Sequence, residues 1–157
     1  MKKLLVILSV FIWSNAVCQS ETQYYKNVIY GSFGRQGYVH VKYERSFLTN
    51  DYRSTIANIG FGIIPVEDEV DAKIITPEIG QLIGFKNFFL ELGVEPSINF
   101  ISGTTYVDLN GIIGLRYQQY NYKSDGIMVQ IGYNPRLINT TNGFINVPFY
   151  LGIGMSF

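Results

Sequence analysis

The chain has 157 residues, a length that suits a single domain. Hydrophobic residues make up 47% of it, including 12 Tyr and 11 Phe, and the formal net charge is zero. This balance argues against a nucleic-acid partner, because phosphate binding needs a basic surface. After residue 18 no stretch approaches the ~18 consecutive apolar residues of a membrane-spanning helix. An apolar chain of this kind is either a soluble β-protein or a membrane barrel.

The first 18 residues have the layout of a secretory signal peptide. Lys2 and Lys3 form a basic n-region, residues 4–13 form the apolar h-region, and residues 15–18 form the segment with small residues before the cleavage site. We expect cleavage after Cys18, which gives a signal peptide over 1–18 and a barrel domain over 19–157. The mature chain would then carry ten Lys and Arg against twelve Asp and Glu. It would hold no cysteine, so no disulfide framework is expected.

Cys18 allows a second interpretation, in which it is the lipid-bearing first residue of a lipoprotein. The residues before it, Asn15-Ala16-Val17, match poorly the Leu-(Ala/Ser)-(Gly/Ala)-Cys pattern of a lipoprotein signal. We therefore favour removal of Cys18 over its lipidation.

Apolar and polar residues alternate with a period of two along the rest of the chain, which is typical of β-strands. Gly, Asn, Asp, Ser and Pro gather between the alternating segments and mark turns. The first strand is the least regular, since Val28-Ile29-Tyr30 favours neither face. The pattern predicts eight strands, near 27–34, 37–47, 54–64, 73–85, 88–95, 105–117, 126–136 and 146–157.

The predicted strands have one apolar face and one face that mixes charges with glycine. Aliphatic and aromatic residues recur on the apolar face, with Gln81 as an exception. The polar residues of the other face are His40, Lys42, Glu44, Asn58, Glu78, Glu91, Glu95, Asp108, Asn110, Arg116, Gln130 and Arg136.

The glycines decide which face points outward. In a soluble sandwich the charged face would meet water, but glycine is poor in a solvent-facing strand because it packs nothing and costs entropy. The interior of a closed eight-stranded barrel is only wide enough for side chains, so small residues must alternate there with large ones. The sequence therefore predicts an all-β fold, an eight-stranded, up-and-down antiparallel transmembrane β-barrel with its apolar face toward lipid.

The last predicted strand is apolar at every second residue. It would close the barrel against the first strand and place its terminal aromatic at the membrane interface. It also resembles the C-terminal signal by which bacterial outer-membrane barrels are recognised by their insertion machinery. This resemblance implies that role for Phe149, Leu151, Ile153, Met155 and Phe157.

Several segments resemble a family of small, mostly uncharacterised bacterial outer-membrane β-barrels. They are YVHVKYERSF (38–47), NFFLELGVEPS (87–97), GIIGLRYQ (111–118), GIMVQIGYNPRL (126–137) and LGIGMSF (151–157). The sequence departs from the family's strand motifs at Leu115, where Tyr is usual, and at Gln130, where Arg is common. The resemblance implies an integral outer-membrane location among lipid and lipopolysaccharide, with insertion machinery and periplasmic chaperones as partners during assembly. It implies no activity.

We interpret the charged face as a structural ion-pair network that fills the barrel, because buried charges must be paired and hydrogen-bonded. Arg116 is expected to pair with Glu91 and Glu44. A polar pathway or a small binding site is the functional alternative for the same residues. The predicted network comprises Lys42, Glu44, Glu91, Arg116 and Arg136.

No catalytic, cofactor or metal site is predicted. His40 is the single histidine, and a general base would need a nucleophile and an orienting acid beside it. Lipid A-modifying barrels are similar in size, and one type carries a His-x-Ser pair on the outer face, whereas here the sequence reads His40-Val41-Lys42 and alternation points His40 inward. The acidic segment 67–71 lacks the glycine and ligand spacing of a calcium loop, so we expect a solvated loop beside lipopolysaccharide.

The expected topology places both termini on the periplasmic side. The connections at 34–37, 65–72, 96–104 and 137–145 then face outward, and none is long enough for a large adhesive crown. The leading function is a non-enzymatic, envelope-structural or surface-interaction role for a monomer in the outer membrane. A narrow pore or small-solute-binding barrel is the second hypothesis, and a lipid-modifying enzyme is the third.

Overall fold

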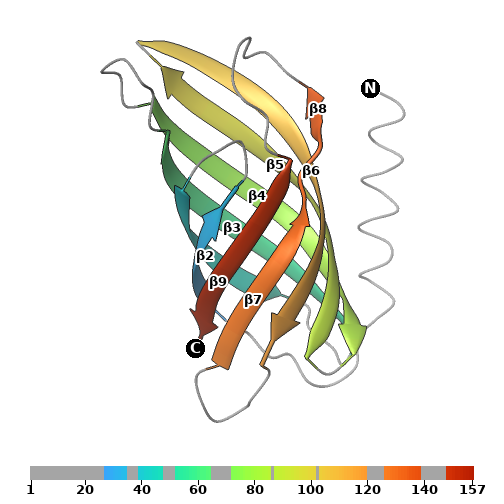
Figure 1. The fold of residues 1–157 in the computed structure, drawn as a ribbon. Coiled ribbons are helices and arrows are strands. Elements are labelled where there is room, and N and C mark those ends of the chain that lie inside the picture. The colour runs from blue at the N-terminus through green and yellow to red at the C-terminus, as the bar shows by residue number, and fades with distance from the viewer. Residues whose placement is uncertain are drawn as a thin grey trace.

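The computed structural model describes residues 27–34, 39–47, 52–64, 72–85, 87–101, 103–119, 126–138 and 148–157. These residues form one antiparallel sheet that closes on itself, because β5 pairs with β6 at the two ends of the strand order β5-β4-β3-β2-β1-β9-β7-β6 (Figure 1). The strands are β1 (Asn27–Phe33), β2 (Val39–Phe47), β3 (Arg53–Ile64), β4 (Ala72–Phe85), β5 (Phe88–Ile101), β6 (Thr104–Gln118), β7 (Gly126–Tyr133), β8 (Arg136–Ile138) and β9 (Phe149–Ser156).

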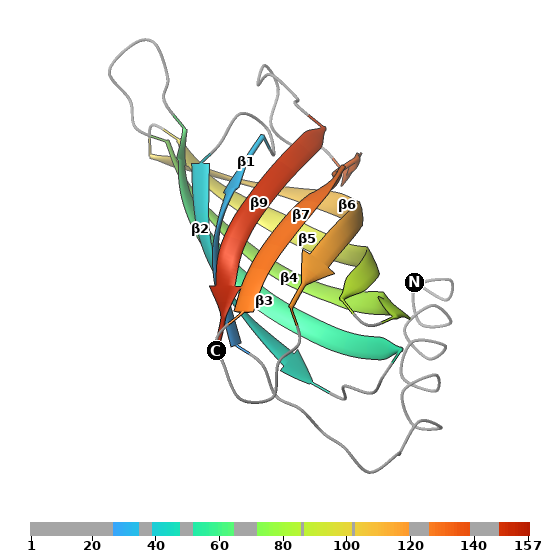
Figure 2. The ribbon, with the colours of Figure 1, turned by 60° about the horizontal axis from the view of Figure 1, so that its bottom comes forward.

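The strands β7 and β8 are two parts of one barrel wall. Both pair with β6, through Leu115 with Ile131 in β7 and Leu109 with Ile138 in β8. The break between them falls at 134–135, where the proline has no N–H for the ladder. The described residues therefore form an eight-stranded antiparallel barrel, which confirms the predicted strand number. Figure 2 shows its strands tilted around the barrel.

The last strand closes the barrel between β1 and β7. Ile153 pairs with Gly31 on one side and with Val129 on the other. The main-chain N–H groups of Asn27 and Phe157 donate to each other's carbonyl oxygens at 3.1 and 2.9 Å. We call the end of the barrel that carries Asn27 and Phe157 the base, and the opposite end the rim.

The prediction for the fifth strand was wrong at its end. It stopped at residue 95 and assigned 96–104 to a connection, whereas β5 continues to Ile101. Pro96 pairs with β6 and stands opposite Pro77 of β4, in a gap of the ladder between the pairs Ile75–Ile98 and Ile79–Val94. Neither proline has an N–H to donate, so placing them opposite each other lets one gap accommodate both.

The other predicted strands agree with the structure to within three residues at each described end. The last strand begins at Phe149 instead of 146, and the predicted seventh strand is divided as described above. Phe85 pairs with Phe88 across the two-residue connection between β4 and β5. The signal peptide at 1–18 and the acidic segment at 67–71 lie outside the described residues.

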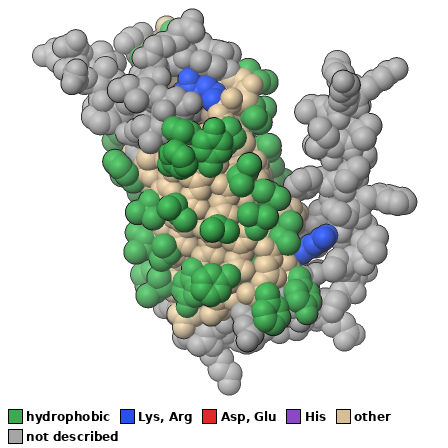
Figure 3. Space-filling view, turned by 45° about the vertical axis from the view of Figure 1, so that its right-hand side comes forward, with side chains coloured by type: hydrophobic (Ala, Val, Ile, Leu, Met, Phe, Trp, Pro, Cys, Tyr) green, Lys and Arg blue, Asp and Glu red, His purple; other side chains and the backbone are tan. Residues whose placement is uncertain are grey.

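The two faces of the sheet are oriented as predicted. Apolar side chains point away from the barrel, with Phe88 70% exposed and Leu115 and Ile153 each 65% exposed. Figure 3 shows them spread over the outer surface. The five carboxylates of the described residues all point inward and are at most 4% exposed, namely Glu44, Glu78, Glu91, Glu95 and Asp108.

No helix in the part of the chain that the structure describes is long and apolar enough to cross a bilayer.

Part of the interior near the base is apolar. One cluster joins Val28, Tyr30 and Met128, and another joins Ile56, Leu82 and Phe89. Ile74, Ile112 and Tyr150 are further buried apolar side chains, and the other buried positions of the described residues are polar or glycine. The apolar core of a soluble barrel is therefore replaced here by a few apolar side chains beside a polar interior.

Glycines on the inward face make room for large neighbours. A Cβ at Gly132 would lie 2.6 Å from the hydroxyl of Tyr150 and 2.7 Å from the carbonyl oxygen of Ile113. Because one of these atoms is backbone, the clash cannot be relieved by a side-chain rotation alone.

We expect Gly132→Ala to lower the free energy of unfolding by about 1–3 kcal/mol, since overpacking strains the interior. The measurement is urea unfolding in detergent, with the gel mobility of the folded form as the readout. Gly31→Ala is the matched control, because a Cβ at Gly31 would meet nothing closer than 3.9 Å. Equal losses in both variants would contradict the packing argument.

Candidate functional site: the polar interior of the barrel

The polar interior draws side chains from every wall of the barrel. The predicted network residues Lys42, Glu44, Glu91 and Arg116 are each at most 1% exposed. Arg136, in β8 near the rim, is half-buried. The structure therefore places all five predicted residues on the inward face, and their contacts divide them into separate groups.

The first group is an ion pair that spans the barrel. Arg116 of β6 donates from Nη1 to Glu44 Oε2 at 2.8 Å and from Nη2 to Glu44 Oε1 at 2.6 Å. Because β2 and β6 are four walls apart in an eight-walled barrel, this bidentate pair bridges opposite sides. A fork of two parallel hydrogen bonds is the strongest form of an Arg–carboxylate contact.

Glu91 lies beside this pair and adds to it. Its neighbour across the β5–β6 ladder is Gly114, two residues from Arg116 on the same face, and its charge attracts the guanidinium. The predicted contact between Arg116 and Glu44 is present, and Glu91 supplies a further electrostatic interaction at a diagonal position of the sheet.

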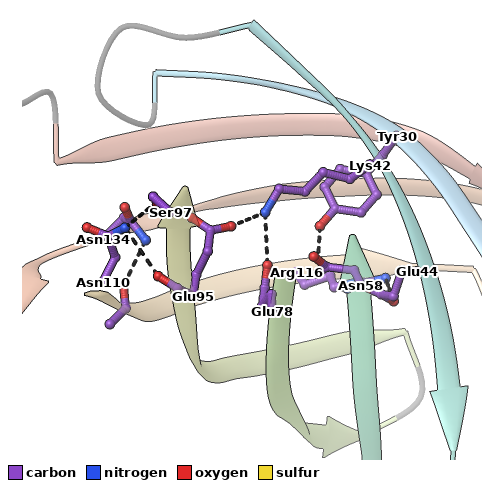
Figure 4. Close-up of polar contacts among 11 residues, drawn as sticks. Tyr30, Lys42, Glu44, Asn58, Glu78, Glu95, Ser97, Asn110, Arg116 and Asn134 are labelled. Carbon is purple, nitrogen blue, oxygen red and sulfur yellow. Dashed lines mark hydrogen bonds and ion pairs between the residues drawn. The ribbon is translucent and has the colours of Figure 1, made fainter. Parts of the chain in front are cut away.

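The second group is centred on Lys42. Its Nζ donates to Glu78 Oε2 at 3.0 Å and also to Glu95 Oε2. The three side chains come from β2, β4 and β5 and point toward one another inside the barrel (Figure 4). Lys42 therefore links β2 to β4 and β5. Its partners Glu78 and Glu95 were not in the predicted network.

The space for Lys42 comes from a glycine on the strand between the paired walls. A Cβ at Gly60 of β3 would lie 2.8 Å from Lys42 Cγ and 2.5 Å from Thr76 Oγ1. The lysine stem therefore crosses β3 where that strand has no side chain. The alternation of glycine with charge in the sequence is a consequence of this crossing.

A third group, near the rim, consists of amides and hydroxyls. Asn110 donates from Nδ2 to Ser97 Oγ at 2.7 Å and to the carbonyl oxygen of Glu95 at 3.2 Å. Asn99 donates to Asp108 Oδ2 at 3.3 Å. Sequence reasoning missed Ser97 and Asn99 because it assigned 96–104 to a connection. The continued alternation beyond Pro96 was the signal that could have found them.

Tyr30 and His40 also lie inside. The Tyr30 hydroxyl accepts a hydrogen bond from Asn58 Nδ2 at 3.1 Å. His40 is 1% exposed, and a Cβ at Gly62 would lie 2.6 Å from its ring. The inward direction predicted for His40 is thus confirmed. Within the described ranges, no group of three or more His, Cys, Asp or Glu is placed to hold a metal ion.

The C-terminal residues predicted to form an insertion signal occupy one row on the outer surface. They are all exposed and belong to β9 or directly follow it, namely Phe149, Leu151, Ile153, Met155 and Phe157. This placement suits a lipid-facing strand, and the recognition role stays a prediction.

Comparison with solved structures finds barrels of similar fold. Neisserial surface protein A (NspA), known from a crystal structure, superposes with a TM-score of 0.52 at 12% identity, over 84% of this chain and 91% of that chain. The de novo designed protein TMB2.3, known from a solution NMR structure, gives a TM-score of 0.40 at 14% identity, over 88% and 96% of the two chains. The likeness to NspA supports the fold alone.

No protein-family model matches the chain, and no curated protein matches it either. The family resemblance therefore stays a prediction from the strand motifs.

Removing one member of the Arg116–Glu44 pair is expected to be costly. Arg116→Met leaves the Glu44 carboxylate buried without its guanidinium, which should lower the free energy of unfolding by about 3–5 kcal/mol. Adding Glu44→Leu to Arg116→Met should recover part of that loss, because the Glu44 charge is then removed with its partner, while the buried Glu91 still lacks the guanidinium. Urea unfolding of the two single variants and the double variant measures the coupling.

Leu115→Met, at the adjacent outward position, serves as the control and is expected to change stability by less than about 1.5 kcal/mol. Additive losses for Arg116→Met and Glu44→Leu would show that the two side chains do not stabilise the barrel as a pair.

Proposed function

We propose that this chain is a small integral β-barrel of the outer membrane of a Gram-negative bacterium, exported through a cleaved signal peptide over 1–18. Its role is envelope-structural or surface-interacting, and non-enzymatic. The observation that carries the proposal is the distribution of polarity in the barrel, with apolar side chains outside and ion pairs inside. Hydrocarbon offers no hydrogen-bond partner to backbone groups, so it requires a closed sheet with this distribution.

Aromatic residues at both ends of the outer surface support this placement. Near the base, Phe88 contacts Tyr117 with ring centroids 5.2 Å apart, and Tyr52 stacks on Phe85 at 5.9 Å. Near the rim, Tyr133 contacts Phe149 at 5.6 Å. Two aromatic belts separated by an aliphatic band are typical of barrels that cross a membrane.

An apolar groove on the outer side of β5–β7 also suits a lipid environment. It has a volume of about 460 Å³, and outward side chains such as Leu90, Leu115 and Ile131 line it. Water would fill such a groove at a cost in free energy, whereas acyl chains would fill it by dispersion contacts.

The interior supports a structural role in preference to transport. The Arg116–Glu44 pair bridges β6 and β2 on opposite sides, and the Lys42 group links β2 to β4 and β5, so side chains occupy the section through which a solute would pass. Buried ion pairs of this kind resist being opened one partner at a time. We accordingly propose a closed barrel that acts as a membrane scaffold.

The partners in this proposal follow from the location. Outer-membrane lipid and lipopolysaccharide surround a monomeric barrel, and insertion machinery and periplasmic chaperones handle it during assembly. We assign no catalytic role to His40, because it is buried inside the barrel while a lipid substrate would lie outside.

A narrow cation-selective pore is the second candidate, favoured by the charge balance of the interior. Among the described residues, five inward carboxylates stand against two fully buried cations, Lys42 and Arg116, and the half-buried Arg136. A rearrangement of the ion pairs would leave a path lined by negative charge, which attracts cations.

Tryptophan fluorescence tests the membrane placement. Trp13 is the one tryptophan of the chain and lies in the predicted signal peptide, so Leu115→Trp in the mature chain would give a single outward probe. We expect brominated phospholipids to quench it strongly in vesicles. Tyr30→Trp, an inward aromatic replacement, should be quenched much less. Equal quenching at both positions would overturn the proposed orientation.

Planar-bilayer recording separates the closed scaffold from the pore. We expect no steady conductance from the wild type. Lys42→Ala should give a measurable cation-selective conductance, because that change removes the ion pairs that link β2 to β4 and β5. Lys73→Ala, at an outward position near the rim, controls for the loss of a positive charge. A steady wild-type conductance that changes with Arg116 or Glu91 would favour the pore instead.

A further inference from the structure

One sector of the outer surface departs from the apolar rule. The outward polar side chains near the base gather on β1–β4, and they are Asn27, Arg45, Arg53, Thr55 and Gln81. The corresponding outward positions of the remaining walls carry mostly apolar or aromatic side chains, namely Phe88, Tyr117, Ile127, Met155 and Phe157, with Gln119 after β6 as an uncharged exception. We call the polar set the basal sector.

The strand register makes the basal sector continuous. Asn27 of β1 pairs with Arg45 of β2, which pairs in turn with Ala57 of β3, two residues from Thr55 on the same face. Thr55 pairs with Gln81 of β4. Residues that oppose each other or lie diagonally across a ladder are within reach of long side chains, so the Thr55–Gln81 pair lies within reach of Arg45.

Hydrogen bonds hold the neutral members of the basal sector in place. Gln81 Nε2 donates to Thr55 Oγ1 at 2.7 Å, and the Tyr43 hydroxyl donates to Asn27 Oδ1 at 2.9 Å. Arg53 lies two residues before Thr55 on the same outward face. The two exposed arginines therefore lie on either side of an ordered polar surface.

The charged side chains that the structure describes on the outer face are all of one sign. All five carboxylates in the described part of the chain point into the barrel, whereas Arg45 and Arg53 point outward and are exposed. Beyond them toward the rim, the same face continues with the exposed apolar side chains Ile59 and Ile79. A cationic surface beneath an apolar one complements a molecule with an anionic head and hydrocarbon tails.

We propose that the basal sector binds the phosphate-bearing headgroup of an anionic phospholipid. The inference rests on the proposed function, because it requires the base to lie at a membrane interface. Arginine forks bind phosphate with two parallel hydrogen bonds. The aliphatic stems of Arg45 and Arg53 lie along apolar surface while their guanidinium groups reach the headgroup level. Lipid tails then pack on Ile59 and Ile79.

Native mass spectrometry of the full, refolded protein in detergent tests this site with added phosphatidylglycerol and, separately, phosphatidylcholine. We expect the wild type to prefer phosphatidylglycerol. Arg45→Gln and Arg53→Gln should each weaken its binding by about fivefold, and both together by about thirtyfold, the factors for about 1 kcal/mol per arginine near a membrane surface. Phosphatidylcholine binding should change much less.

Lys73→Gln is the matched control, because Lys73 is an exposed outward cation near the rim, and it should leave phosphatidylglycerol binding unchanged. Unaltered phosphatidylglycerol binding in the double arginine variant would overturn the inference. So would a dimeric wild type that becomes monomeric in the double variant, because the basal sector would then be a contact between two copies of the chain. Heat-modifiable gel migration and brominated-lipid quenching report membrane insertion independently, so failure of the headgroup site is distinguishable from failure of the proposed function.

Discussion

The rest of this structure depends on the narrowness of the barrel. Eight strands enclose only enough space for side chains, so polar groups that point inward must satisfy one another. The Arg116–Glu44 pair meets this requirement across the full width of the interior, with both guanidinium ends hydrogen-bonded to one carboxylate. Without bulk water, the attraction between such charges is strong, and so is the penalty for separating them. The inner ion pairs and the closed sheet therefore stabilise each other.

The same narrowness explains why glycine accompanies charge in the sequence. A long side chain that crosses the interior passes over the opposite or adjacent strand, and that strand must have no side chain at the crossing. Gly60 leaves room for the Lys42 stem, and Gly132 leaves room for the Tyr150 ring. Glycine is normally unfavourable in a strand interior. Here its cost in chain entropy is offset by contacts that any larger residue would prevent.

These relations set the limit of what the sequence could predict. Alternation identified the inward face correctly, and the charge on that face indicated that Arg116 would contact Glu44. It could not identify Glu78 and Glu95 as the partners of Lys42, because contacts between walls that are not adjacent depend on strand tilt and on the order of closure. Neither quantity is encoded by a period of two. The end of β5 was misplaced for a related reason: the predicted strand stopped just before Pro96, and whether the ladder accommodates that proline depends on Pro77 standing opposite it.

The segregation of charge across the sheet connects the interior with the membrane. Inward carboxylates outnumber inward cations in the described strands, while the exposed charges of the outer face, Arg45, Arg53 and Lys73, are all positive. A sheet is thin enough for these two sets of charges to attract each other through it. The outer arginines therefore lower the free-energy cost of burying the inner carboxylates. In water that outer charge would be screened by salt. Beside anionic headgroups and hydrocarbon it would be screened less and matched by phosphate, so the arrangement of charge that stabilises the interior also favours a lipid environment for the outer surface.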